Sequence, residues 1–366
     1  MVLKEYNPTI PMIGGINMFG VLVMFHFIFS FVSSCDARIK GAPYPTSPVI
    51  ENISWDFTSL RRAAIGSDLW PITWANDNTL FTAWGDGGGF GGTNRDGRSS
   101  LGVAQTKGSG ANWQGFNIFG GKNSESKANF SGKPTGLIYI DRVLYMGVVE
   151  QNKWLRWKIG RSTDHGRTWI FNGTPFSSYW DFAEPDGAFS DTVFLNFGKN
   201  YQGARDGYVY AYSQDHRALS SQHDIAMFRV PKEHIMDRKY YEYFAGIDTY
   251  GKPRWTSDIS KRAPVFTDTN GIGWGVRVDF NPVLHRYFLT TWHGYDGSWG
   301  VFDAPEPWGP WTTVAYYERW IDSIPKFGFS FPQKWISKDG KTLWMVFSGE
   351  GIYDSFNVIK ARFTLK

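Results

Sequence analysis

The sequence predicts an all-β protein, a five-bladed β-propeller, and two observations lead to this prediction. The 366 residues include 18 Trp, 18 Tyr, 29 Phe and 41 Gly. This composition is typical of sheets with many tight turns, because aromatic side chains favour pleated surfaces and Gly readily adopts positive φ. In addition, a similar hairpin recurs five times after residue 65, where no long stretch keeps the 3.6-residue period of a helix.

Charge and cysteine content exclude several classes of protein. The chain has 38 Lys and Arg residues against 34 Asp and Glu residues, so its net charge is only +4. A charge this small is not the footprint of a nucleic-acid-binding protein. The single Cys rules out a disulfide framework within the chain and a zinc site built from several Cys.

The N-terminus reads as an export signal. Residues 18–32, MFGVLVMFHFIFSFV, are apolar except for His26 and Ser30 and are shorter than the about 20 residues of a membrane span, as in a signal peptide. The following Cys35 comes after two Ser residues, which resembles the bacterial lipobox, whose Cys is lipidated. We therefore expect residues 1–34 to be a signal peptide and Cys35 to anchor an exported lipoprotein in the cell envelope. Cleavage near Ser34 to give a secreted protein, or an uncleaved anchor, are the alternatives.

The five hairpins define the predicted blades. Their central strands are Leu80–Trp84, Leu144–Val148, Val209–Ser213, Tyr287–Thr291 and Leu343–Phe347. Each follows a turn rich in Asn, Asp or Gly, and an apolar strand precedes that turn. A third strand follows in each case, at Ser100–Gln105, Leu155–Arg161, Asp224–Val230, Ser298–Asp303 and Asn357–Phe363.

Repeated antiparallel units of three to four strands predict propeller blades. We expect four-stranded blades with few helices in residues 61–366, and residues 35–60 as a linker or first strand. Closing the ring protects exposed strand edges, so the last strand should lie near the first blade and the N-terminal residues should supply an outer strand there. A β-sandwich with coincidental hairpins is the alternative.

One hairpin carries a recognisable motif. Residues 162–169, STDHGRTW, match the Asp-box S-x-D-x-G-x-T-W, which resembles the hairpin between the outer strands of sialidase-type blades. Its Asp caps backbone amides, its Gly takes positive φ and its Trp packs between sheets. In families that carry it the box is structural, so it indicates fold and not sialidase activity.

Longer blocks resemble one bacterial propeller family. They are GSDLWPITW at 66–74, AWGDGGGFG at 83–91, SLGVA at 100–104 and APEPWGPW at 304–311. The family, of the DUF4185 type, was long called a domain of unknown function, and some members are endo-D-arabinanases. The chain is also distantly similar to five-bladed furanosidases and arabinanases, in which acidic residues ring a central funnel. This resemblance implies an enzyme that hydrolyses an arabinan-like polysaccharide.

Strand order places the candidate residues on one face. In each blade we expect the innermost strand to begin at one face of the propeller and the second strand to return to that face. The residues before the innermost strand and the loop after the second strand therefore lie on the same face. The predicted catalytic residues are Asp68, Glu184 and Asp186. The predicted substrate-binding residues are Trp74, Asp86, Arg277, His293 and Glu350. A carboxylate pair suits glycosidic cleavage, and aromatic rings suit sugars. The distant relatives also have an acid at the start of blade 2, where this sequence has Lys133.

No resident cofactor or metal is expected. His216 and His223 are seven residues apart in one loop, and no H-E-x-x-H motif occurs. The loop 85–92 contains G-x-G-x-x-G, but another strand follows it instead of a helix, so it is a poor dinucleotide fingerprint. The question of a structural Ca²⁺ in the channel stays open. We expect a monomer that binds a polysaccharide or oligosaccharide.

Two other functions compete with hydrolysis. A polysaccharide lyase abstracts a proton beside a uronate carboxylate, and His293, Tyr295 and Arg277 in blade 4 would supply its base and its cation. A non-catalytic glycan-binding propeller on the cell surface would need aromatic platforms but no pair of acids.

Overall fold

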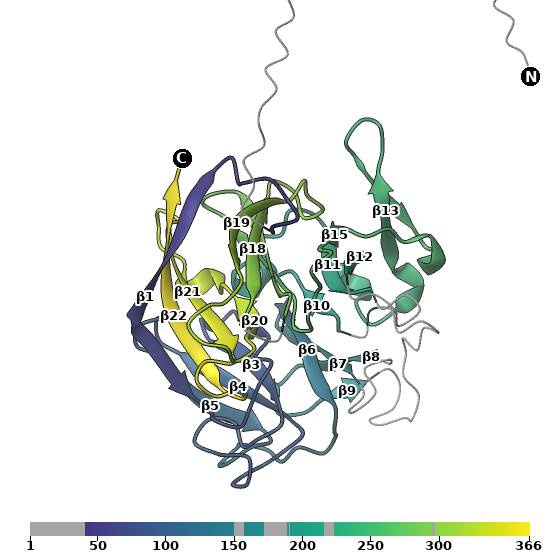
Figure 1. Ribbon diagram of the computed structural model, residues 1–366. Helices are drawn as coiled ribbons and strands as arrows, with labels where there is room; N and C mark the ends of the chain where they lie inside the picture. Colours follow the sequence, from purple (N-terminus) through teal and green to yellow (C-terminus); the bar gives the residue numbers. More distant parts are fainter. Residues whose placement is uncertain (1–40, 150–156, 172–188, 190, 216–222, 295–296) are drawn as a thin grey trace, which may run out of the picture. The chain divides into compact units, whose positions relative to one another are not determined.

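The structure is a computed structural model that describes residues 41–149, 157–171, 189, 191–215, 223–294 and 297–366. Its strands form five sheets arranged as the blades of a β-propeller, so the predicted fold is confirmed (Figure 1). The helical segments within the described residues are single 3-10 turns: η1 (Lys199–Tyr201), η3 (Lys232–His234), η4 (Arg238–Tyr240), η5 (Ile259–Lys261) and η6 (Gln333–Trp335). Within the described part of the chain, no helix is long and apolar enough to cross a membrane.

Four blades are four-stranded antiparallel sheets, each ordered from an innermost to an outermost strand. Blade 1 contains, in this order, β2 (Ile72–Trp74), β3 (Leu80–Gly85), β4 (Leu101–Lys107) and β5 (Gln114–Phe119). Blade 2 contains β6 (Lys133–Ile140), β7 (Val143–Val149), β8 (Trp157–Ser162) and β9 (Ile170–Phe171). Blade 4 contains β16 (Arg277–Asn281), β17 (Arg286–Trp292), β18 (Trp299–Ala304) and β19 (Thr312–Tyr317). Blade 5 contains β20 (Phe327–Ser330), β21 (Thr342–Ser348), β22 (Phe356–Leu365) and β1 (Ile50–Ala63).

Blade 3 departs from the predicted four strands. Its sheet contains β10 (Val193–Phe194), β11 (Tyr208–Gln214), β12 (Asp224–Pro231), β13 (Glu242–Ile247), β14 (Pro253–Thr256) and β15 (Phe266–Thr267). The additional strands arise because the chain forms the β13–β14 hairpin before returning through β15, which pairs with β12. The expectation of four strands was therefore wrong for this blade.

The N-terminal strand closes the ring. β1 pairs antiparallel with β22, with the register running from Ile50 opposite Leu365 to Ala63 opposite Phe356. Blade 5 thus combines the two ends of the described chain, as Figure 1 shows. This pairing covers the edge that β22 would otherwise expose. As expected, β22 also borders blade 1, because the Phe356 ring lies 4.8 Å from the ring of Trp70.

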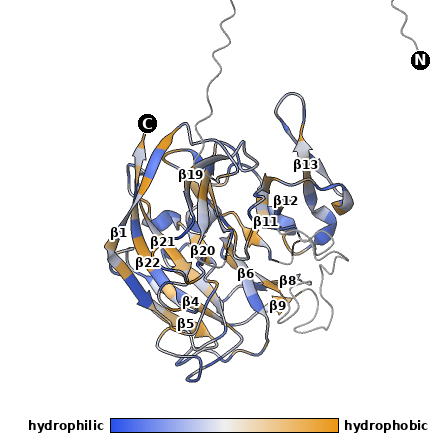
Figure 2. Cartoon of the chain, viewed as in Figure 1, coloured by the Kyte–Doolittle hydropathy of each residue, from blue (hydrophilic) through white to orange (hydrophobic). Residues whose placement is uncertain are grey.

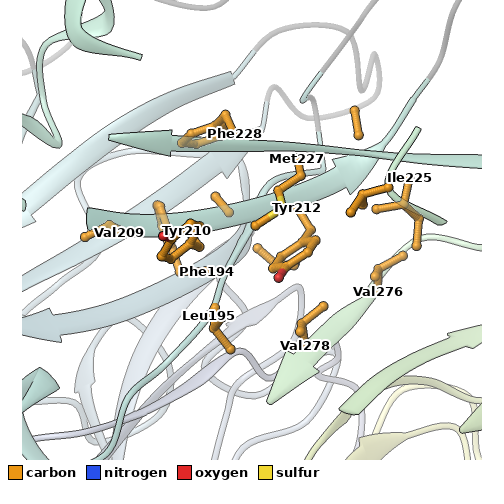
Figure 3. Close-up of a cluster of buried hydrophobic side chains, with 14 of the residues drawn as sticks. Phe194, Leu195, Val209, Tyr210, Tyr212, Ile225, Met227, Phe228, Val276 and Val278 are labelled. Atoms are coloured by element: carbon orange, nitrogen blue, oxygen red, sulfur yellow. The ribbon is translucent and has the colours of Figure 1, made fainter. Parts of the chain in front are cut away.

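The core lies between neighbouring blades. The second strands of blades 1 and 4, β3 and β17, are buried along their whole length, because neighbouring blades cover their faces. Figure 2 shows apolar segments along strands of the blades such as β21 and β22. Figure 3 shows one such contact, in which Tyr212 and Ile225 of blade 3 lie near Val276 and Val278 at the beginning of blade 4.

The 162–169 segment forms a tightly bonded turn between β8 and β9. The Asp164 carboxylate accepts hydrogen bonds from the Ser162 hydroxyl (2.7 Å) and from the Thr168 amide (3.0 Å) and hydroxyl (2.6 Å). Gly166 has φ 87, and its carbonyl accepts a bond from the Trp169 indole at 3.0 Å. The turn lies at the end of blade 2 opposite Lys133, since Ser162 pairs with Leu144 whereas Lys133 pairs with Val149.

Candidate active site

Among the described residues, the innermost strands leave only a small cavity at the propeller axis. A cavity of about 10 Å³ lies among the innermost strands, which is room for about one water molecule. Asn196 blocks it with an amide that donates to Ile72 (3.4 Å) and Leu137 (3.3 Å) and accepts from Thr73 (2.6 Å). This cavity is therefore too small to hold a sugar ring, and we look for a candidate site among the described residues at its mouth.

Asp68 lies at this mouth, just before β2. Backbone hydrogen bonds of 3.1 Å join it to Gly85 at the end of β3. The residue keeps some solvent access, while its Oδ1 atom is buried and has no hydrogen-bond partner among the described residues. Burial, reinforced by the negative charges of Asp354 and Asp86 and opposed by Lys133, raises the pKa of Asp68 to about 8. Asp68 therefore retains its proton at neutral pH.

Asp86 lies just after β3, at the beginning of the Gly-rich loop. Its φ of 57 is a left-handed conformation, which Asp adopts more readily than most residues. Its carboxylate forms an ion pair with Lys133, the first residue of β6, and accepts a hydrogen bond of 2.9 Å from Arg98. Cations from blade 2 and from the loop itself thus hold this carboxylate in place.

Asp354 adds a third carboxyl group from blade 5. It lies in the loop between β21 and β22. Burial raises the pKa of Asp354, and the charge of Asp86 adds to this, whereas a hydrogen bond with Asn94 and the charges of Lys133 and Arg98 lower it. The three acids therefore influence one another although they come from different parts of the sequence.

We refer to Asp68, Asp86, Asp354, Lys133 and Arg98 as the carboxylate cluster. It combines three acids with two cations, so a single retained proton makes it neutral. A partly buried group of charges is most easily maintained when the charges balance. The pKa of Asp68 assigns that proton to Asp68. The cluster thus presents a protonated acid beside a carboxyl group that is paired with two cations, which is a combination suited to acid–base chemistry.

The backbone after Asp68 is conformationally unfavourable. Leu69 and Trp70 have φ values of 77 and 46, and such conformations cost about 1–3 kcal/mol each in a residue with a side chain. Packing maintains them. The Trp70 indole is fully buried against Phe356 and donates a hydrogen bond of 3.0 Å to the carbonyl of Ser355. The carboxyl group of Asp68 is therefore set by surrounding blades as well as by its own strand.

Arg277, the first residue of β16, reaches the same mouth from blade 4. Its guanidinium is buried and donates to the carbonyl groups of Leu69 (2.8 Å) and Val276 (2.9 Å). Burial lowers the pKa of Arg277 to about 10, against the charges of Asp191 and Asp279, so the side chain stays cationic at neutral pH. The structure thus places Arg277 against the backbone that follows Asp68. Its predicted contact with substrate stays a prediction.

Two other predicted residues lie apart from the carboxylate cluster. Glu350, in the loop after β21, forms an ion pair with Arg62 of β1. His293, directly after β17, stacks on Tyr316 of β19 with a ring separation of 4.1 Å. His293 therefore packs against the outermost strand of its own blade. Binding of substrate by Glu350 or His293 stays a prediction.

Trp74 lies at the other end of blade 1. It ends β2, and its indole donates a hydrogen bond of 3.0 Å to Asn78 in the following turn. A larger groove of about 630 Å³ opens at this end, and its lining includes Asp77, Lys107 and Lys334. The groove is lined by one carboxylate and lacks the pair that glycosidic cleavage requires. We therefore take the carboxylate cluster as the candidate active site.

Several predicted residues cannot be placed. Glu184, Asp186, Tyr295 and Cys35 lie outside the described residues, so their predicted roles stay predictions. Among the residues that are described, no group of three or more His, Cys, Asp and Glu side chains is arranged to hold a metal ion.

The structure brings Asp354, Lys133 and Arg98 to Asp68 and Asp86. Asp354 lies in the loop after the second strand of blade 5, where strand order predicts candidate residues. Glu350 lies in the same loop, and the sequence offers no reason to choose Asp354 instead. Lys133 stood out in the sequence only as the cation that replaces an expected acid. The ion pair with Asp86 gives it a role in holding the cluster together.

Comparison with known proteins identifies the family. Residues 61–359 match a domain of unknown function, DUF4185. The chain belongs to this family. No curated protein matches the sequence.

Several solved structures are similar to this DUF4185 protein. A crystal structure of a putative hydrolase from Bacteroides ovatus is 11% identical with a TM-score of 0.47, covering 82% of this chain and 87% of the other. The α-L-arabinofuranosidase PaAbf62A from Podospora anserina is 10% identical with a TM-score of 0.46, covering 86% and 95%. A GH43_1 enzyme from Xanthomonas citri is 13% identical with a TM-score of 0.44, covering 86% and 92%.

Proposed function

We propose that this protein is a glycoside hydrolase that cleaves an arabinan-like polysaccharide. The observation that carries the proposal is the carboxylate cluster, in which Asp68 keeps its proton at neutral pH beside the ion-paired Asp86. Glycosidic cleavage needs one carboxylic acid and one carboxylate. The arabinan substrate rests on the sequence resemblance to a family that includes endo-D-arabinanases.

In this proposal Asp68 is the general acid. Its proton passes to the glycosidic oxygen as the bond from that oxygen to the anomeric carbon breaks, and the bonding electrons remain with the oxygen. Water then supplies the hydroxyl group at the anomeric carbon, and an ionised carboxylate accepts the proton that water loses. We assign to Asp86, the carboxyl group that Lys133 and Arg98 hold near Asp68, the stabilisation of the positive charge that develops on the sugar ring. Glu184 and Asp186 remain candidates for the second catalytic carboxylate.

The contacts of Arg277 and His293 give less support to a lyase. A lyase needs a cation free to neutralise a uronate carboxylate, but two hydrogens of the Arg277 guanidinium are donated to backbone carbonyls. His293, the proposed base, stacks on Tyr316 of the outermost strand of blade 4.

The experiment that tests the proposal is incubation of the purified protein with D-arabinan, L-arabinan and a uronate-containing polysaccharide. We expect new reducing ends from an arabinan and no product with ultraviolet absorbance. Unsaturated products would identify a lyase instead. Retention of a glycan without any product, after long incubation with a broad panel, would identify a binding protein and refute hydrolysis.

We also propose export and lipidation at Cys35, supported by the apolar segment 18–32 and the residues that precede the Cys. Mass spectrometry of the protein from its native host should show a lipidated N-terminal Cys, and Cys35→Ala should release the protein from the membrane fraction. An unmodified N-terminus in a cytoplasmic fraction would contradict this. The enzyme is proposed to act as a monomer without a resident cofactor.

A further inference from the structure

The contact between Arg277 and Leu69 crosses the mouth of the propeller. Arg277 begins the innermost strand of blade 4, whereas Leu69 precedes the innermost strand of blade 1, and blade 5 lies between these two blades in the ring. The hydrogen bond from Nη2 to the Leu69 carbonyl is 2.8 Å long and fully buried. It joins residues 208 positions apart in the sequence.

The hydrogen bond acts on an unfavourable stretch of backbone. Leu69 has φ 77 and follows Asp68 directly, so the orientation of the Leu69 carbonyl and that of the Asp68 carboxyl are set by adjacent torsions. A residue with a side chain keeps such a conformation only where its surroundings enforce it. Arg277 supplies a rigid planar donor for this, and Lys has no equivalent.

Blade 5 leaves room for this contact through a glycine. Gly328, in β20, has φ 70, and a Cβ atom there would lie only 2.6 Å from the Leu69 carbonyl oxygen and 3.6 Å from Nη2 of Arg277. A side chain at position 328 would therefore displace the carbonyl that Arg277 holds. Gly328, which has no side chain, and the guanidinium of Arg277 together define the position of the Leu69 carbonyl.

We propose that Arg277 is a positioning residue, which fixes the carboxyl group of Asp68 at the mouth of the propeller by holding the Leu69 carbonyl. This inference rests on the proposed function, in which Asp68 is the general acid. Arg277 acts through the backbone and not by its charge on Asp68. The charged groups that act on the Asp68 carboxyl are Asp354, Lys133 and Asp86, whereas Arg277 interacts with Asp191 and Asp279.

The inference makes a measurable difference to Asp68. Without the hydrogen bond, the backbone at Leu69 relaxes and the buried Oδ1 atom of Asp68 gains contact with water. Since burial is the main cause of the raised pKa, that pKa moves back toward 3.8. A substrate-binding role for Arg277 would change KM and leave the titration of Asp68 unaltered.

The experiment is a titration of the aspartate carboxyl carbons by NMR in the full chain, with the signal of Asp68 identified from its loss in Asp68→Asn. We expect Arg277→Met to lower the pKa of Asp68 by at least about one unit and kcat at neutral pH by at least about tenfold. KM should change less than kcat. Gly328→Ala, which alters no charge, should shift both in the same direction, and Arg277→Lys should have a smaller effect.

Two matched controls separate positioning from general destabilisation. Arg286→Met removes another buried guanidinium from blade 4, one that pairs with Asp303 at 2.7 Å. Gly207→Ala adds a methyl group where no atom lies within 4 Å. Both should leave the titration of Asp68 unchanged.

The inference is overturned if Arg277→Met and Gly328→Ala titrate like the controls, or if only KM changes. If Arg277→Met does not fold, the pKa of Asp68 and kcat are measured in Gly328→Ala and Arg277→Lys, and unchanged values in both variants overturn the inference. Absence of hydrolysis by the unaltered protein would refute the proposed function, yet the titration would still show whether Arg277 and Gly328 control the position of Asp68.

Discussion

Replacement of Asp68 by Asn should abolish turnover and make the protein more stable at alkaline pH. Asn keeps the shape of the side chain but cannot donate a carboxylic proton to a leaving group. Loss of a general acid typically lowers the rate by at least about a hundredfold. The gain in stability has a separate cause, which is that Asn does not ionise.

The magnitude follows from the pKa of Asp68. In the unfolded chain Asp68 loses its proton near 3.8, whereas in the folded protein it retains it up to about 8. Between these two pH values the folded state binds more protons, so the free energy of unfolding falls as pH rises and levels off above about 8. At about 1.4 kcal/mol per pKa unit, the upper limit is about 6 kcal/mol. We expect about 2–4 kcal/mol, because partial solvent access reduces the cost of the charge.

Urea unfolding of the wild type and Asp68→Asn at pH 5, 7 and 9 measures this difference. The stability of Asp68→Asn relative to the wild type should increase across the series, and reducing-end assays at neutral pH should show no turnover. Asp141→Asn is the matched control, because that side chain is 69% exposed. If Asp68 merely capped the beginning of β2, Asn would replace it with near-normal turnover and no pH-dependent gain, and the argument would be refuted.

Other perturbations should have distinct effects. The pH at which kcat/KM declines on the alkaline side should lie near 8, and Lys133→Met should move it upward, because the Lys133 charge lowers the pKa of Asp68; an unchanged profile would contradict the assignment. Asp164→Ala should cost about 1–2 kcal/mol in thermal unfolding while turnover stays within about twofold, since three hydrogen bonds are lost at the far end of blade 2. Deletion of residues up to 63 should abolish cooperative unfolding or cause aggregation, because it exposes the edge of β22. Dialysis against a chelator should leave activity unchanged, and restoration of lost activity by Ca²⁺ would show a metal requirement.

Much of the fold follows from local sequence. The alternation of aromatic strands with turns at Asn, Asp and Gly predicts five hairpins. The central strand of each hairpin and the strand predicted after it appear as the second and third strands of a blade. Turn chemistry is equally local: in residues 162–169 every partner of Asp164 lies within four positions. Such features can be read from the sequence because neighbouring residues determine them.

The composition of the candidate site could be predicted only in part. Topology placed Asp68 and Asp86 on one face, but the pKa of Asp68 depends also on Asp354 from blade 5 and on Lys133 from blade 2. No local pattern distinguishes Asp354 from Glu350, whose carboxylate pairs with Arg62 instead.

The sequence by itself therefore determined the all-β class, the five repeated units and the face that carries the acids. The tertiary structure decided which acids meet, which of them keeps its proton, and how Arg277 reaches Leu69 across 208 residues. It also decided the extra strands of blade 3 and the pairing of β1 with β22. The physical reason is that burial, charge coupling and strand pairing depend on distances between segments far apart in the chain, and these distances exist only once the ring of blades has closed.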